Sequence, residues 1–139
     1  MSSDHLVLGI DIPVAWGEQD AFGHLNNVVY FRYFENVRMY YLERIGVLRS
    51  LEEQRIGVIL ASTTCDFHKP VLWPATLHVR TGCARVGNTS FVLDYRITDR
   101  IGDEVATGTS VLVMYDYAAA GKVTIPDAVR QAIEALQRG

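Results

Sequence analysis

The hydrophobic pattern between Asn27 and Ile45 constrains the fold most, because apolar residues there recur every three or four positions. The apolar stripe consists of Tyr30, Phe34, Val37, Tyr41 and Ile45. Gly46 follows and is a natural C-cap. The flanks of this predicted helix are also apolar and contain Val28, Val29, Phe31, Met39, Tyr40 and Leu42. A helix that is apolar on most sides is usually buried on most sides, so other elements must wrap around it.

Five other segments have the alternation or the β-branched and aromatic composition of strands. The predicted strands are residues 6–14, 58–67, 76–86, 90–98 and 104–115. Pro13 indicates an edge or a strand end, and short turns join the last three strands into a meander. A final surface helix over 125–136 has Pro126 near its start and an apolar face of Val129, Ile133 and Leu136. We therefore predict an α+β fold, with a five-stranded antiparallel sheet around one long helix.

Length and charge narrow the functional class. The 139 residues predict one domain, 1–139, without a separate cofactor-binding domain. A net charge of -3 provides no basic field for nucleic acid. The apolar runs are shorter than the roughly 20 residues that span a membrane, and residues 1–9 do not form a basic leader followed by an apolar stretch. We expect a cytoplasmic protein without nucleic-acid or membrane partners, in which Cys65 and Cys83 are small buried side chains.

The densest polar cluster precedes the long helix. It contains Glu18, Gln19, Asp20, Gly23, His24, Asn26 and Asn27. Asn26 or Asn27 is a good N-cap, and the first-turn amides beyond it form a set of donors that stabilises a developing oxyanion. Gly23 would let the loop fold Asp20 back toward these amides. A carboxylate beside an oxyanion site predicts acyl-transfer chemistry, while simple helix capping is the competing interpretation.

Other kinds of catalytic site have little support. His5, His68 and His78 show no metal-ligand spacing with Asp20 or His24, so we expect no metal. The sequence has no Gly-x-Ser-x-Gly elbow, and neither cysteine has a catalytic context. If the chain is an enzyme, Asp20 is its reactive group.

The residues around Asp20 also follow a specific motif. Residues 20–30 read Asp-x-x-Gly-His-x-Asn-Asn-x-x-Tyr, and Phe34-Glu35 and Arg38 follow. This stretch resembles the hotdog-fold acyl-CoA thioesterases of the 4-hydroxybenzoyl-CoA thioesterase type. The resemblance continues through residues 66–70, 85–90 and 125–126. It implies a hotdog fold that hydrolyses acyl-CoA to free acid and CoA, with no added cofactor because CoA is part of the substrate.

The resemblance implies roles for particular residues. Asp20 would be the catalytic carboxylate, as nucleophile or as general base, and the backbone amide of Asn27 would polarise the thioester carbonyl. His24 would orient the site. The expected substrate-binding residues are Gly23, Asn26, Tyr30 and Phe31 near the helix, and Lys69, Arg85, Asn88, Thr89 and Ser90 for CoA. Basic residues at strand ends are also often merely solvated. We expect the acyl chain to lie beside Phe31, and Phe34 to belong to the core.

Oligomeric state and two rival functions complete the expectations. Unpaired sheet edges predict that the chain forms at least a homodimer, and a tetramer is the alternative. The resemblance implies that the active sites are shared between subunits. One rival is a hotdog hydroxyacyl-thioester dehydratase, whose pattern has a His five residues after the Asp, whereas His24 is four residues after Asp20. The other is a non-enzymatic acyl-CoA-binding module, against which the retained Asp20 argues.

Overall fold

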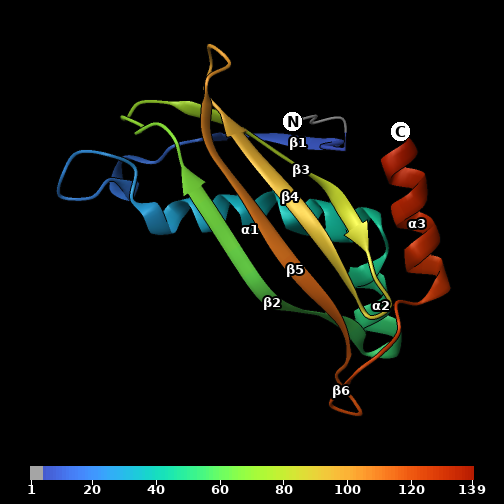
Figure 1. The fold of residues 1–139 in the computed structure, drawn as a ribbon. Coiled ribbons are helices and arrows are strands. Elements are labelled where there is room, and N and C mark those ends of the chain that lie inside the picture. Colours follow the sequence, from blue (N-terminus) through green and yellow to red (C-terminus); the bar gives the residue numbers. More distant parts are fainter. Residues whose placement is uncertain (1–4) are drawn as a thin grey trace.

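An antiparallel sheet forms the main layer of the computed structural model, which describes residues 5–139 (Figure 1). Its long strands are β1 (Leu8–Pro13), β2 (Ile56–Phe67), β3 (Thr76–Val86), β4 (Ser90–Thr98) and β5 (Glu104–Asp116). Their order in space is β1-β3-β4-β5-β2, so β1 and β2 are the edges. The first four residues of the N-terminal segment lie outside the described part of the chain.

The five predicted strands and the meander β3–β4–β5 are confirmed, with bounds that agree to within two residues. Two elements were not predicted. A sixth strand, β6 (Gly121–Lys122), is only two residues long and pairs with β5. A helix, α2 (Val47–Gln54), follows α1 (Asn27–Arg44) after Gly46, whose φ of 84° turns the chain. Both elements are too short for periodicity to reveal them.

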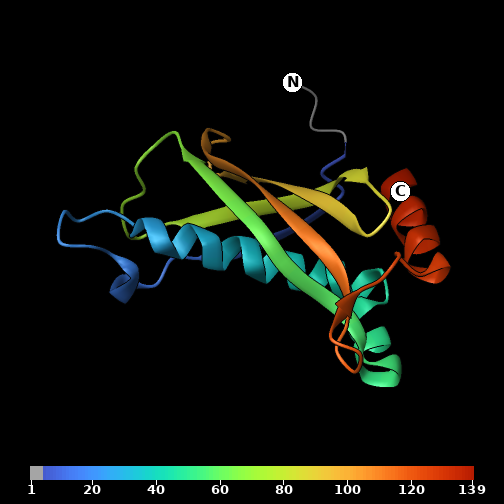
Figure 2. The same ribbon diagram turned by 60° about the horizontal axis from the view of Figure 1, so that its bottom comes forward.

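The sheet curls over α1, which runs along its concave face (Figure 2). The alternation predicted for β4 holds, because Phe91, Leu93, Tyr95 and Ile97 are all buried in the core. Phe34 on α1 packs beneath the sheet, with its ring stacked on Tyr95 at a centroid distance of 4.5 Å. This packing is the α+β arrangement that the sequence pattern predicts, and it agrees with the hotdog fold that the resemblance implies.

The expectation that α1 is buried on most sides is wrong for a single chain. The sheet covers one side of the helix, and Val28 and Tyr40 on the other side are 65% and 55% exposed. Ile59 and Leu60 on the edge strand β2 are exposed as well. One chain supplies one curved layer, so part of the apolar flank of the helix remains uncovered.

The C-terminal helix α3 (Asp127–Arg138) closes the end of the molecule near the β3–β4 turn (Figure 1). Val129 and Ile133 are buried, as the predicted apolar face requires. The Gln137 side chain accepts hydrogen bonds from the Tyr41 hydroxyl at 2.8 Å and from the Cys83 amide at 2.9 Å. Over residues 5–139, no helix has the length and apolarity needed to cross a membrane.

Candidate active site

A cavity of about 310 Å³ lies at the start of α1. The loop before α1, the first turn of α1 and the segment after β2 form its walls. The lining residues are Asp20, His24, Leu25, Asn27, Tyr30, Phe67, His68, Lys69 and Pro70. The fold therefore brings five of the predicted site residues into one cavity, although sequence positions 20 and 69 are far apart.

The loop that carries Asp20 closes on itself. The Asp20 amide donates to the His24 carbonyl at 2.8 Å, and the Gly23 amide donates to the Asp20 carbonyl at 3.1 Å. Gly23 has a φ of 80°, a conformation that favours glycine. The Asp20 Oδ1 atom accepts from the Phe22 amide at 2.8 Å and from the His24 amide at 3.4 Å. These bonds fix the direction of the carboxylate and leave Oδ2 without a partner among residues 5–139.

The start of α1 supplies a free donor. Asn26 is the N-cap, and its side chain accepts from the Val28 amide at 3.1 Å. The Val29 amide donates to the Asn26 carbonyl at 3.0 Å. The Asn27 amide donates to no acceptor in the described residues, and Asn27 lines the cavity. An unpaired amide at the positive end of a helix dipole is suited to stabilise an oxyanion.

Glu18 and Tyr33 anchor the Asp20 loop to α1, a role that sequence reasoning missed. Glu18 ends the short helix η1 (Trp16–Glu18), and its Oε1 accepts from the Tyr33 hydroxyl at 2.6 Å and from the Ala15 amide at 2.7 Å. Burial and the neighbouring Glu18 carboxylate raise the pKa of Tyr33 above its usual range, so its hydroxyl remains a donor. The sequence contained one sign of this anchor: Tyr33 lies one position before Phe34, next to the apolar stripe of α1.

Two further groups near the cavity differ in what they offer. Cys65 on β2 packs against the core and is half-buried, contrary to the expectation of a buried side chain, whereas Cys83 is buried as expected. Burial raises the pKa of the Cys65 thiol to about 11, so it is neutral near neutral pH and a poor nucleophile. His24 is exposed, and its imidazole has no hydrogen-bond partner in residues 5–139.

Lys69 lies at the cavity, but its charge is already neutralised. Its Nζ donates to Asp99 at 2.6 Å and to Asp103 at 2.9 Å. The bond from Lys69 also lowers the pKa of Asp99 below its usual value. Lys69 is therefore not a free cation in this structure, and its role as a CoA contact stays a prediction.

The other predicted CoA residues lie at the opposite end of the sheet. Arg85, Asn88, Thr89 and Ser90 surround the β3–β4 turn (Figure 1). β3 has 11 residues and so extends for about 35 Å from the end near the Asp20 loop to this turn. These four residues do not line the Asp20 cavity within one chain.

The remaining predicted residues lie around the loop and along the helix. Asn26 caps α1, and Gly23 lines a neighbouring cavity of about 290 Å³ on the Trp16 side of the loop. Phe31 is half-buried, and its ring meets the ring of Phe34 edge-on at 6.2 Å. Phe34 is fully buried, which agrees with the core role predicted for it.

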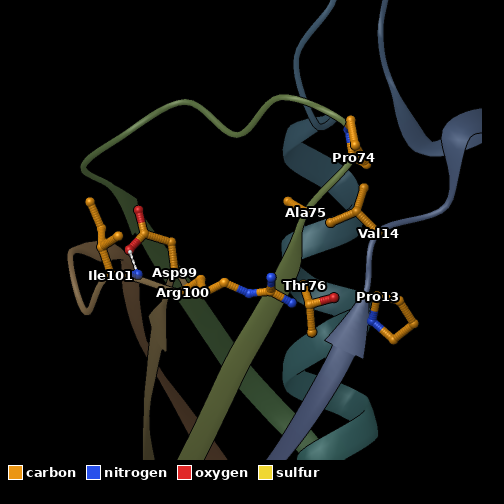
Figure 3. Close-up of a pocket in the computed structure, with 8 residues that line it drawn as sticks. All are labelled: Pro13, Val14, Pro74, Ala75, Thr76, Asp99, Arg100 and Ile101. Atoms are coloured by element: carbon orange, nitrogen blue, oxygen red, sulfur yellow. Dashed lines mark hydrogen bonds between the residues drawn. The ribbon is translucent and has the colours of Figure 1, made fainter.

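Larger cavities lack this combination of groups. Figure 3 shows one of about 510 Å³, with apolar walls formed by Pro13, Val14, Ala75 and Ile101 among others. The Asp99 carboxylate in this cavity already accepts hydrogen bonds from Lys69 Nζ and from the Ile101 amide. A cavity of about 520 Å³ lies on the outer face of the sheet, away from α1. Within residues 5–139, no group of three His, Cys, Asp or Glu side chains is arranged to hold a metal ion.

Comparison with known proteins identifies the family. The model of the thioesterase-like superfamily matches residues 14–133. The chain belongs to the thioesterase-like superfamily. It is a thioester hydrolase with the hotdog fold. This membership agrees with the resemblance carried by the motif at residues 20–30.

Several known proteins are similar to this chain over most of its length. The uncharacterized protein YsmA of Bacillus subtilis is 29% identical over 122 residues, which are 88% of this chain and 82% of YsmA. The structure of the PA2801 protein from Pseudomonas aeruginosa is 33% identical, with a TM-score of 0.81 over 92% of this chain and 98% of that chain. A thioesterase from Thermus thermophilus, complexed with coenzyme A and Zn, is 25% identical, with a TM-score of 0.85 over 97% of each chain.

Proposed function

We propose that the chain hydrolyses acyl-CoA thioesters to free acid and CoA, with Asp20 as the reactive carboxylate. The observation that carries this proposal is the shared cavity, in which the fixed carboxylate of Asp20 lies with the unpaired amide of Asn27. The structure of a related thioesterase with bound coenzyme A supports the choice of CoA as carrier.

Asp20 has the right environment for hydrolysis in either of two ways. As general base, its free oxygen takes a proton from water, and the resulting hydroxide adds to the thioester carbon. As nucleophile, the same oxygen adds to that carbon, and water then hydrolyses the mixed anhydride. In both cases negative charge develops on the carbonyl oxygen, which the Asn27 amide stabilises, and the C–S bond breaks to release CoA thiolate.

A homodimer would complete the CoA site. The long edge strand β2 exposes its backbone and the apolar residues Ile59 and Leu60, which favours pairing with a second copy. Two-fold antiparallel pairing sets the Ile56 end of one β2 against the Phe67 end of the other. The β3–β4 turn lies near the Ile56 end, because the Met114 amide donates to the Thr89 carbonyl. Residues 85–90 of one copy would then approach the Asp20 cavity of the other.

A panel of acyl-CoA substrates tests the proposal, with aliphatic chains of increasing length and aromatic acyl groups. We expect thiol release from at least one of them, and His24→Ala should lose less activity than Asp20→Asn. Hydration of an enoyl-CoA without thiol release would instead indicate the dehydratase. Tight binding of acyl-CoA without turnover would indicate a binding module.

A further inference from the structure

The hydroxyl of Tyr30, unlike those of the other core tyrosines, has no hydrogen-bond partner among the described residues. The buried tyrosines are Tyr30, Tyr33, Tyr41 and Tyr95. The last three each have a polar partner: Glu18 for Tyr33, Gln137 for Tyr41 and Arg38 for Tyr95. Tyr30 is only 3% exposed, yet its hydroxyl forms no hydrogen bond with any of the described residues. The Tyr30 hydroxyl is not among the fully enclosed polar atoms that lack a partner, so its oxygen is accessible although the rest of the side chain is buried. This oxygen is therefore free to donate to a molecule bound in the cavity that Tyr30 lines.

The position of Tyr30 on the helix directs its ring toward the catalytic cavity. Side chains on an α-helix lean toward its N-terminus, and Tyr30 is three residues after Asn27, on the neighbouring turn. Tyr30 lines the same cavity as Asp20 and Asn27. Its ring also packs edge-on against Phe67 at a centroid distance of 4.9 Å, which restrains the ring from the side of β2.

The protonation state of Tyr30 makes it a donor. Burial raises its pKa, and the neighbouring Cys65 and Asp20 raise it further. The Tyr30 hydroxyl therefore keeps its proton at neutral pH and does not act as a base.

We propose that the Tyr30 hydroxyl is a catalytic hydrogen-bond donor to the carbonyl oxygen of the thioester. With the Asn27 amide it forms an oxyanion site of two donors. When Asp20 or the water it activates adds to the carbonyl carbon, the C=O electrons move to the oxygen and both donors stabilise the charge. The C=O bond then re-forms as the C–S bond breaks, and Tyr30 retains its proton throughout. This proposal rests on the proposed acyl-CoA hydrolysis.

Tyr30→Phe removes only the hydroxyl. Loss of one oxyanion donor should lower kcat by about 100-fold and leave KM within about threefold, because the bond strengthens mainly in the transition state. Tyr41→Phe is the matched control, because it removes a buried phenol hydroxyl from the far end of the same helix. We expect Tyr41→Phe to keep the wild-type kcat, even if its melting temperature falls.

A spectroscopic measurement separates a bond to the substrate from a bond to Asp20. The infrared C=O stretch of a ¹³C-labelled acyl-CoA is compared between Asp20→Asn and the double variant Asp20→Asn, Tyr30→Phe. A donor to the carbonyl lowers this frequency, so the double variant should show a higher one. An unchanged frequency would overturn the proposal, as would a wild-type kcat in Tyr30→Phe. If the frequency shifts but the wild-type protein releases thiol from no acyl-CoA, the proposed hydrolysis is refuted. The hydrogen bond from Tyr30 to the thioester carbonyl is then still supported.

Discussion

Replacing Phe34 by Ala should cost stability without changing acyl selectivity, because the Phe34 ring belongs to the core. The ring is fully buried, stacks on Tyr95 and covers Gly108 so closely that a Cβ there would clash with it. Removing such a ring costs about 3–5 kcal/mol. In a chain of 139 residues, 1 kcal/mol corresponds to about 3–4 °C in Tm, so Tm should fall by about 10–20 °C.

Thermal unfolding at a fixed protein concentration measures this loss, since Tm depends on concentration if the protein is oligomeric. Phe31→Ala is the matched control on the same helix, and it should lose less because Phe31 is only half-buried. The ratio of long-chain to short-chain kcat/KM should be unchanged in Phe34→Ala. A loss of stability below about 1 kcal/mol, or an altered chain-length profile, would refute the core assignment.

Three further predictions concern selectivity, pH and assembly. Phe31→Ala should raise the ratio of long-chain to short-chain kcat/KM, because the space left by the ring lets a longer acyl chain bury more CH₂ groups, each worth about 0.8 kcal/mol. An unchanged ratio would place the acyl pocket elsewhere. Lys69 lowers the pKa of Asp99 below 3.8, so this pair stabilises the fold above about pH 4 and less as the pH falls through the lowered pKa. Lys69→Met should therefore reduce Tm more near pH 7 than near pH 2, and an equal reduction at both would contradict this. Leu60→Glu should yield an inactive monomer in sedimentation, whereas an intact, active dimer would argue against pairing through β2.

The long elements of the fold were predictable because each pattern of apolar residues continues over many positions. Alternation along residues 90–98 and the helical stripe of 27–45 each correspond to one buried face in the structure. β6 and α2 carry too few residues for a period to be detected. The exposed flank of α1 was misjudged because apolar composition indicates burial without identifying whether the same chain or another provides the cover.

The core of the site was predictable because it is local in sequence. Only one tight loop separates Asp20 from Asn27. A turn at Gly23 and a helix start at Asn26 therefore suffice to place both residues in one cavity. The ion pairs of Lys69 depend on the turn after β4, and periodicity contains no information on such long-range partners. Periodicity likewise assigned Tyr30 to an apolar face, and only the surrounding structure reveals that its hydroxyl lacks a partner.

Asp20→Asn tests the central claim most directly. The amide oxygen of Asn can still accept from the Phe22 and His24 amides, so the loop should keep its shape while the negative charge is lost. Asp11→Asn is the matched control, an exposed carboxylate on β1 beside His78. Thiol release from the best acyl-CoA should fall by at least about 100-fold in Asp20→Asn, with Tm unchanged, and should be unaltered in Asp11→Asn. Wild-type turnover in a folded Asp20→Asn protein would contradict the assignment of Asp20 as the reactive carboxylate.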